Sequence, residues 1–180
     1  MKLNKLVKIS LLSAISIVLA YFALPLPFFP PWLKIDLGDL PAIIAAFAFG
    51  PLSGIIVEVI KNALVLVIRN SGTFGIGEAA NFIIGAMMVL PAGLIYKKSK
   101  NKRSALIGLI VGVISMTIGG VIINYLVIFP VYEILMHFTL PKSTLITAIL
   151  PFNILKGTIL GILTLLLYKR ISPILHKKLN

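Results

Sequence analysis

The sequence predicts an all-α integral membrane protein, a single bundle of six transmembrane helices with both termini in the cytoplasm. Three observations lead to this fold class: the composition, a set of six apolar segments, and the placement of the basic residues. Hydrophobic residues make up 59% of the 180 residues and charged residues only 12%, and the mean hydropathy is +1.08. Soluble domains are about half apolar and about one-quarter charged. The composition therefore indicates a chain embedded in lipid, and the length fits one domain.

The first apolar segment is expected to be a retained helix and not a cleaved signal peptide. Cleavage after Ala23 would place the bulky Tyr21 where a signal peptidase needs a small residue, and prolines follow at once. The second segment is short for a full span of about 20 residues, so we expect it to be tilted, partial or interrupted. Prolines and glycines mark the breaks between segments. The predicted helices are residues 7–24, 37–50, 52–68, 78–96, 104–129 and 145–168.

The basic residues predict the orientation of the bundle. Twelve of the 17 lie in three clusters: the N-terminus, the break before residue 104, and the C-terminus. With six spans, all three clusters fall on one side of the membrane, and the positive-inside rule makes that side the cytoplasm. The net charge of +12 is thus expected to reflect topology and contact with anionic lipid, not nucleic-acid binding.

Several polar side chains are predicted to lie at membrane depth. A helix rises about 1.5 Å per residue, so the distance from the basic clusters gives the depth of each side chain. Five polar residues from three helices fall in the outer half of the membrane: Glu78, Asn81, Asn124, Asn153 and Lys156. One interpretation is an ion pair between Glu78 and Lys156 that only ties helices together. The other is a polar pocket open to the outside, which the three amides favour because an ion pair does not need them.

A second polar set lies on the third helix. Glu58 and Lys61 are at i, i+3, so we expect them to neutralise each other, with Asn62 beside them. A proton or coupling pathway is the alternative.

The first loop, "LPLPFFPPWLKIDLGD", is too rich in proline to be helical. Its aromatic residues predict either an interfacial belt or a lid that stacks on a flat ligand.

No motif in the sequence predicts catalysis, a metal site or a resident cofactor. The chain has no cysteine, and it lacks both the GxxxxGK[ST] motif that cradles ATP phosphates and the HExxH motif that binds zinc. The stretch "GTFGIGE" joins two membrane helices and follows no strand, so it is not a dinucleotide fingerprint. We therefore expect a protein that is not an enzyme.

Three stretches resemble a known family. Residues 34–62 ("KIDLGDLPAIIAAFAFGPLSGIIVEVIKN"), 77–98 ("GEAANFIIGAMMVLPAGLIYKK") and 151–157 ("PFNILKG") are similar to the riboflavin-binding S component of energy-coupling factor (ECF) vitamin transporters. The resemblance extends over nearly the whole chain. It implies six helices in a prokaryotic plasma membrane and a vitamin pocket near the extracellular side. It also implies partners that supply the energy, a membrane scaffold subunit and two ATP-binding subunits.

The resemblance also implies roles for particular residues. Asn124, Asn153 and Lys156 match the family's polar contacts to the flavin ring, and the stretch Asp36, Leu37, Gly38 and Asp39 matches its region near the ribityl chain. With Glu78 and Asn81, these residues form the predicted binding site. Riboflavin is then the transported ligand and not a cofactor. Small residues on helix one dock the scaffold in this family, and here the candidates are Ser10 with Ala14 and Ser16 with Ala20.

Two other functions are open at this stage. One is an S component for a different vitamin, such as folate, thiamine or pantothenate. An anionic vitamin should require more than one basic residue at pocket depth, and only Lys156 clearly qualifies. The other is a stand-alone, ion-coupled carrier, which usually has inverted repeats and a binding site at the midplane. We see no repeat in the sequence.

Overall fold

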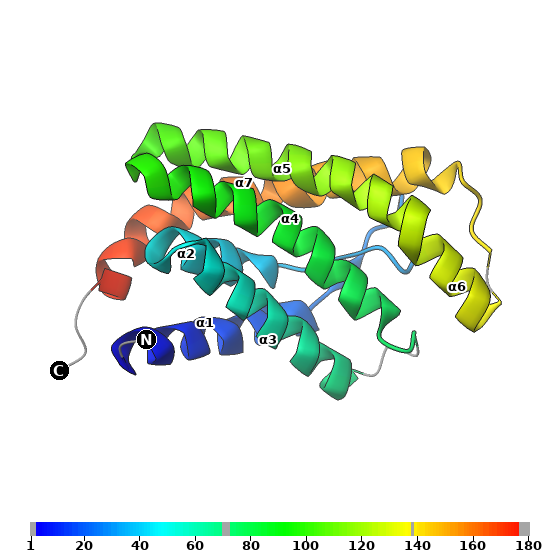
Figure 1. Cartoon of the computed structure of the whole chain (residues 1–180), viewed down its shortest axis with the longest axis horizontal. Coiled ribbons are helices and arrows are strands. Elements are labelled where there is room, and N and C mark those ends of the chain that lie inside the picture. Colours follow the sequence, from blue (N-terminus) through cyan, green and yellow to red (C-terminus); the bar gives the residue numbers. More distant parts are fainter. Residues whose placement is uncertain (1–2, 70–72, 138, 177–180) are drawn as a thin grey trace.

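The computed structural model describes residues 3–69, 73–137 and 139–176, and it confirms the all-α fold (Figure 1). Five of its helical stretches are long and apolar enough to cross a membrane. Each of the six predicted segments is helical over most of its length, but the first helix ends at Tyr21 and not at residue 24, and the second begins at Asp39 and not at residue 37. The helices are α1 (Leu3–Tyr21), α2 (Asp39–Phe49), α3 (Pro51–Arg69), α4 (Ile76–Ser99), α5 (Lys102–Ile123), η1 (Asn124–Ile128), α6 (Phe129–Met136), η2 (Leu145–Ile149) and α7 (Leu150–His176), where η denotes a π-helical stretch.

The second segment is an interior helix. α2 has only 11 residues, and every residue from Asp39 to Phe47 is buried. Gly50 joins α2 to α3 with a φ of 96°, a conformation that glycine adopts without steric cost. Since α2 is enclosed by the other helices, it presents almost no surface to lipid, which explains why this segment is shorter than a membrane span.

The fifth predicted helix is longer than the sequence indicated. α5 continues through η1 into α6, so the apolar span runs from Lys102 to Met136 and passes the predicted end at residue 129. Pro130 lies just beyond η1, and Pro151 lies just beyond η2. Proline cannot donate the usual helical hydrogen bond and its ring clashes with the preceding turn. A widened π turn accommodates that clash without ending the helix.

The first loop is not helical, as predicted, and forms a short hairpin. β1 (Leu24–Pro25) pairs antiparallel with β2 (Lys34–Ile35), with Leu24 opposite Ile35. Phe29 in the hairpin loop packs edge-on against Phe152 of α7, with ring centroids 5.5 Å apart. This contact places the loop over the start of α7.

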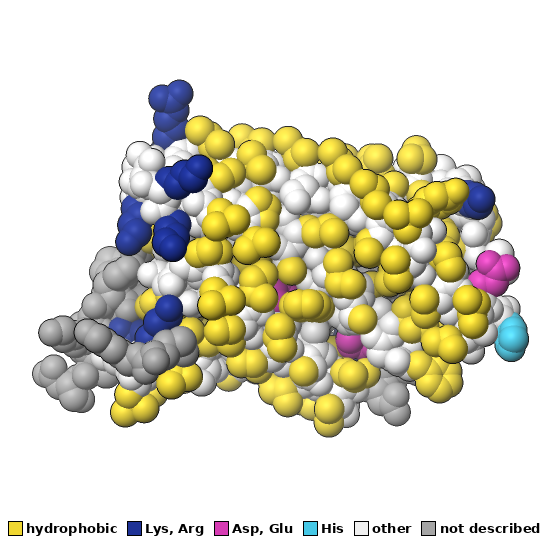
Figure 2. All heavy atoms as spheres, viewed as in Figure 1, with side chains coloured by type: hydrophobic (Ala, Val, Ile, Leu, Met, Phe, Trp, Pro, Cys, Tyr) yellow, Lys and Arg dark blue, Asp and Glu magenta, His cyan; other side chains and the backbone are white. Residues whose placement is uncertain are grey.

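The bundle has one basic end. The start of α1, the end of α7 and the connection between α4 and α5 lie at the left of Figure 1, and lysine and arginine side chains gather at that same end in Figure 2. The sides of the bundle are largely apolar. The predicted grouping is thus present for the basic residues that the structure describes, whereas Lys2, Lys177 and Lys178 lie outside the described residues. The assignment of this end to the cytoplasm stays a prediction.

Tight packing fills the half of the bundle near the basic end. Phe47 of α2 stacks on Tyr96 of α4 with ring centroids 4.3 Å apart, and the Tyr96 hydroxyl donates to the Tyr168 hydroxyl at 2.8 Å. On the neighbouring face, Gly108 and Gly112 of α5 lie directly against the α4 backbone. Such small residues let two membrane helices approach closely.

Candidate functional site

A cavity of about 670 Å³ lies among α1, the hairpin, α3, α4, η1, α6 and α7. Its volume falls within the range of about 300–1,000 Å³ that is typical of small-molecule sites. Six of the nine predicted binding residues line it: Asp36, Glu78, Asn81, Asn124, Asn153 and Lys156. The predicted outer pocket thus brings residues from four separate segments to one space.

The other three predicted residues do not line the cavity. Leu37, Gly38 and Asp39 lie behind its wall; Asp39 is only 1% exposed. The Gly38 backbone instead fixes the local turn, because its N–H donates to Asp36 Oδ1 at 2.9 Å and its carbonyl accepts from Ser16. These residues therefore hold the wall in place, and their direct contact with a ligand stays a prediction.

Two amides face the cavity from α7 and η1. Asn124 Nδ2 donates to the Gly120 carbonyl at 2.7 Å, within its own helix. Asn153 Nδ2 is buried and has no hydrogen-bond partner among the described residues. It lies directly over Gly120, where any side chain would collide with it. An unpaired buried donor costs about 1–3 kcal/mol, so Asn153 offers a ready donor to an acceptor atom of a ligand.

The Lys156 ammonium is surrounded by oxygen atoms. It donates to Asp36 Oδ2 at 3.0 Å and to Asn81 Oδ1 at 3.2 Å, and Asp39 Oδ2 lies 2.9 Å away. The alternative interpretation, an ion pair between Lys156 and Glu78 that only ties helices together, is thus not what the structure contains. Glu78 instead accepts from Thr73 Oγ1 at 3.5 Å. The hairpin and the start of α2 bring two carboxylates to Lys156 that lie about 120 residues earlier in the chain, so no helical spacing could indicate them.

The predicted pair on α3 is present. Lys61 Nζ lies 2.8 Å from Glu58 Oε2, and Asn62 Nδ2 donates to the same carboxylate oxygen at 3.2 Å. Lys61 also pairs with Asp39 of α2, which the sequence did not indicate. The two polar sets that the sequence placed separately are thus in contact.

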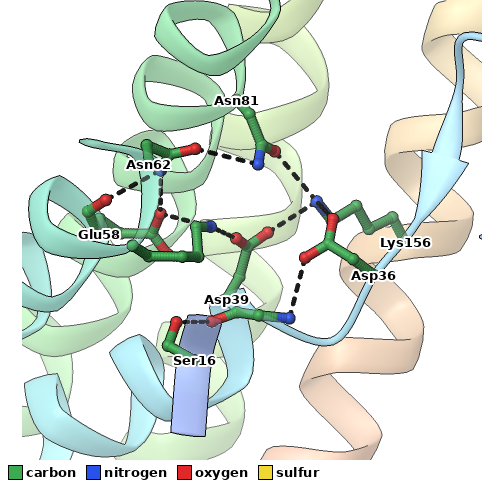
Figure 3. Close-up of polar contacts among 9 residues, drawn as sticks. Ser16, Asp36, Asp39, Glu58, Asn62, Asn81 and Lys156 are labelled. Atoms are coloured by element: carbon green, nitrogen blue, oxygen red, sulfur yellow. Dashed lines mark hydrogen bonds and ion pairs between the residues drawn. The ribbon is translucent and has the colours of Figure 1, made fainter. Parts of the chain in front are cut away.

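Together these contacts form a closed circuit of hydrogen bonds and ion pairs, drawn in Figure 3, which we call the polar ring. Asn81 Nδ2 donates to Asn62 Oδ1 at 3.2 Å and closes the circuit between α4 and α3. In order, the ring runs Lys156, Asn81, Asn62, Glu58, Lys61, Asp39 and back to Lys156. Its first three members line the cavity and its last three lie behind the wall.

Among the residues that line the cavity, Lys34, Arg69 and Tyr132 were not predicted from the sequence. Tyr132 belongs to a stripe at every fourth residue that also includes Asn124, Ile128 and Met136. That spacing can be read from the sequence. It was not recognised because the predicted helix ended at residue 129, before Tyr132 and Met136. Trp32 and Lys34 place the hairpin in the wall, as the lid interpretation predicted, whereas Phe28 is 94% exposed, as the belt interpretation predicted.

The predicted docking residues of α1 divide into two groups. Ser10 and Ala14 are exposed, among large apolar residues such as Leu11 and Val18. Ser16 and Ala20 are buried, and Ala20 lines the cavity. The second pair faces inward in this structure, where α1 needs small residues to meet Gly38, and its part in docking stays a prediction.

The described residues contain no group of three or more His, Cys, Asp and Glu side chains placed to hold a metal ion. The arrangement is instead that of a ligand cavity: hydrogen-bonding groups from four segments around a space of ligand size.

Comparison with known proteins shows the family of the chain. The family described as "ECF transporter, substrate-specific component" matches residues 4–168. The chain is 38% identical to the riboflavin transporter FmnP of Bacillus subtilis (strain 168), over 96% of this chain and 94% of that protein. It is 40% identical to the riboflavin transporter RibU of Staphylococcus aureus (strain TCH60), over 97% and 93%. A solved S component of a bacterial ECF transporter is 40% identical, with a TM-score of 0.85 and coverage of 98% of this chain and all of that chain.

Proposed function

Because the chain belongs to the substrate-specific (S) components of ECF transporters, we propose that it captures riboflavin in the cavity and delivers it across the membrane. Its relatives carry the name riboflavin transporter. The observation that carries the proposal is the unpaired Asn153 Nδ2 beside the cavity, close along α7 to the Lys156 ammonium. An isoalloxazine ring edge has carbonyl oxygens and ring nitrogens that can accept from both donors.

The direction of capture follows from the charge distribution. If the basic end faces the cytoplasm, as the positive-inside rule predicts, the cavity lies in the extracellular half of the bundle. The packed half around Phe47 and Tyr96 then separates it from the cytoplasm. Riboflavin then enters from outside, and its release into the cytoplasm requires partners that impose a large conformational change on the bundle.

We propose that those partners are a membrane scaffold subunit and two ATP-binding subunits. The sequence has no phosphate-binding loop of its own, so ATP hydrolysis must be supplied by other chains. On α1, the exposed small residues Ser10 and Ala14 offer a place where a scaffold helix can approach closely.

Titration of the detergent-purified protein with riboflavin tests the proposal. Binding should quench flavin fluorescence, and riboflavin should raise the thermal unfolding midpoint, as any ligand of the native state does. Thiamine, folate and pantothenate should not compete. Binding of one of these in place of riboflavin would assign the chain to a different vitamin. Uphill uptake into liposomes by this chain alone, driven by an ion gradient, would favour a stand-alone carrier.

A further inference from the structure

We propose that Lys61, a residue without contact to the cavity, is a positioning residue that sets riboflavin affinity through the polar ring. The inference rests on the proposed function, since it concerns how Lys156 meets its ligand. Lys61 is fully buried and lies behind the wall. It can therefore influence a ligand only through other side chains.

The first connection runs through Asp39. This carboxylate lies between two ammonium groups, with Lys61 at Oδ1 and Lys156 at Oδ2. While Lys61 occupies one oxygen, Asp39 is already neutralised and holds Lys156 by its other oxygen only. Without Lys61, Asp39 would depend on Lys156 alone for its counter-charge, and the ammonium would be drawn back from the cavity.

The second connection runs through the two amides. Lys61 pairs with Glu58, whose carboxylate accepts from Asn62, and Asn62 in turn accepts from Asn81. This chain fixes which way the Asn81 amide points, so that its oxygen faces Lys156. Both routes around the ring lead from Lys61 to the same ammonium (Figure 3).

Lys156 needs such support because of its side chain. Lysine carries a compact charge on a flexible four-carbon stem, so nothing in its own covalent structure fixes the ammonium. On α7 it is the ring and Asp36 that determine where the charge lies. A ligand that meets a fixed ammonium avoids the entropy cost of ordering it.

A double variant separates positioning from charge balance. The ring and Asp36 together contain three carboxylates and two ammonium groups. Lys61→Met alone would leave two excess negative charges in place of one, and the protein would lose stability for that reason. Lys61→Met combined with Glu58→Gln keeps the original balance but removes both of the contacts made by Lys61.

We expect this double variant to keep a ligand-free unfolding midpoint close to that of the wild type and to bind riboflavin about tenfold more weakly, the effect of one lost hydrogen bond to a charged group. The absorption spectrum of bound riboflavin should shift toward that of Lys156→Met, because the ammonium has moved away from the ring edge. Thr164→Val is the matched control. It removes a fully buried hydroxyl bonded within α7, remote from the cavity, and should change neither affinity nor spectrum.

Wild-type affinity and an unchanged spectrum in the folded double variant would overturn the inference. If that variant does not fold, Asp39→Asn replaces it: this nearly isosteric change cuts the link between the two lysines and should weaken binding and shift the spectrum in the same way. A riboflavin affinity and an absorption spectrum of Asp39→Asn equal to those of the wild type would likewise overturn the role of the polar ring. Failure of the wild-type protein to bind riboflavin would contradict the proposed function instead, so the two failures are distinguishable.

Discussion

Asn153 and Lys156 lie one helical turn apart on α7, yet their polar atoms are in opposite situations. The Asn153 amide nitrogen has no partner among the described residues, whereas the Lys156 ammonium lies within 3.2 Å of three oxygen atoms. Removing the Asn153 amide takes away a buried donor that has no acceptor, so the folded protein should not lose stability. Removing the Lys156 ammonium leaves buried carboxylates without their counter-charge.

Paired substitutions at these positions should therefore differ in their effect on the ligand-free protein. Asn153→Leu is expected to keep or raise stability, because it removes an unsatisfied donor from an apolar span. Lys156→Met should lower it by about 3–5 kcal/mol, the usual cost of breaking a buried ion pair from one side. Both should weaken riboflavin binding, Asn153→Leu by about 1–3 kcal/mol.

Thermal unfolding in detergent, with and without riboflavin, measures both effects. Equal stabilisation of the wild type and both variants by riboflavin would show that neither side chain contacts the ligand. A stable Lys156→Met protein would contradict the ion pairs with Asp36 and Asp39.

Much of the site was predictable from the sequence, but not its connections. Counting residues along three helices placed five polar side chains in the outer half of the membrane, and all of them line the cavity: Glu78, Asn81, Asn124, Asn153 and Lys156. The partners of Lys156 could not be predicted, because Asp36 and Asp39 reach it only after the hairpin and α2 have folded inward. Spacing along a helix indicates local pairs such as Glu58 with Lys61 and is silent on contacts between distant segments.

Among the structural elements, the hairpin differs most from the rest of the fold. Lys34 of its second strand and Trp32 in the preceding turn line the cavity. Its aromatic contact with the bundle, among the described residues, is the packing of Phe29 on Phe152. Phe152 itself lies beside Asn153 in the wall. We expect this ring contact to determine how firmly the hairpin closes the cavity.

Phe29→Ala should consequently release the hairpin and weaken riboflavin binding. The contact between the rings is worth about 0.5–1.5 kcal/mol beyond the area that it buries, so the dissociation constant should rise by roughly 2- to 13-fold. The expected cause is faster escape of ligand, which stopped-flow fluorescence can measure. Phe28→Ala is the matched control, since Phe28 is 94% exposed. Equal effects of the two changes would mean that the hairpin acts through general contact with lipid and not as a lid.

The helices were largely predictable because their apolar segments are long, and the main exception occurs at a proline. Pro130 was taken as the start of a break, but it lies just past a π turn within a continuing helix, as does Pro151 inside the predicted sixth helix. In water an interior proline usually ends a helix. In a membrane the surrounding helices keep the segment helical, and a local π turn accommodates the proline ring. A proline that would end a helix in a soluble protein therefore does not end it here.

At the scale of the whole molecule, the basic end predicts the orientation in the membrane. Lys100 lies between α4 and α5 at this end, and Lys142 lies between α6 and η2. The chain has no cysteine, so a single cysteine at either position can be labelled without background. An impermeant thiol reagent outside intact cells should label Lys142→Cys and leave Lys100→Cys unlabelled. The reverse pattern would invert the protein and place the cavity in the cytoplasmic half.

Substitutions on the two faces of α1 should have different effects on ligand binding and on assembly with the energy-coupling module. Ala14 is exposed, so Ala14→Trp should keep a scaffold helix at a distance and abolish uptake while riboflavin binding persists. Ala20 is buried and lines the cavity, so Ala20→Trp should fill ligand space and abolish binding itself. Ile162→Trp on the exposed side of α7 controls for added bulk facing lipid and should alter neither property.

Uptake in cells, binding to the purified protein, and co-purification of the scaffold subunit together separate these outcomes. Loss of binding in Ala14→Trp with an intact scaffold complex would contradict the docking assignment, because the outward face of α1 would then be part of the ligand site. Normal uptake in Ala14→Trp would move the docking surface to another helix. Normal binding in Ala20→Trp would show that the ligand does not occupy the part of the cavity beside α1.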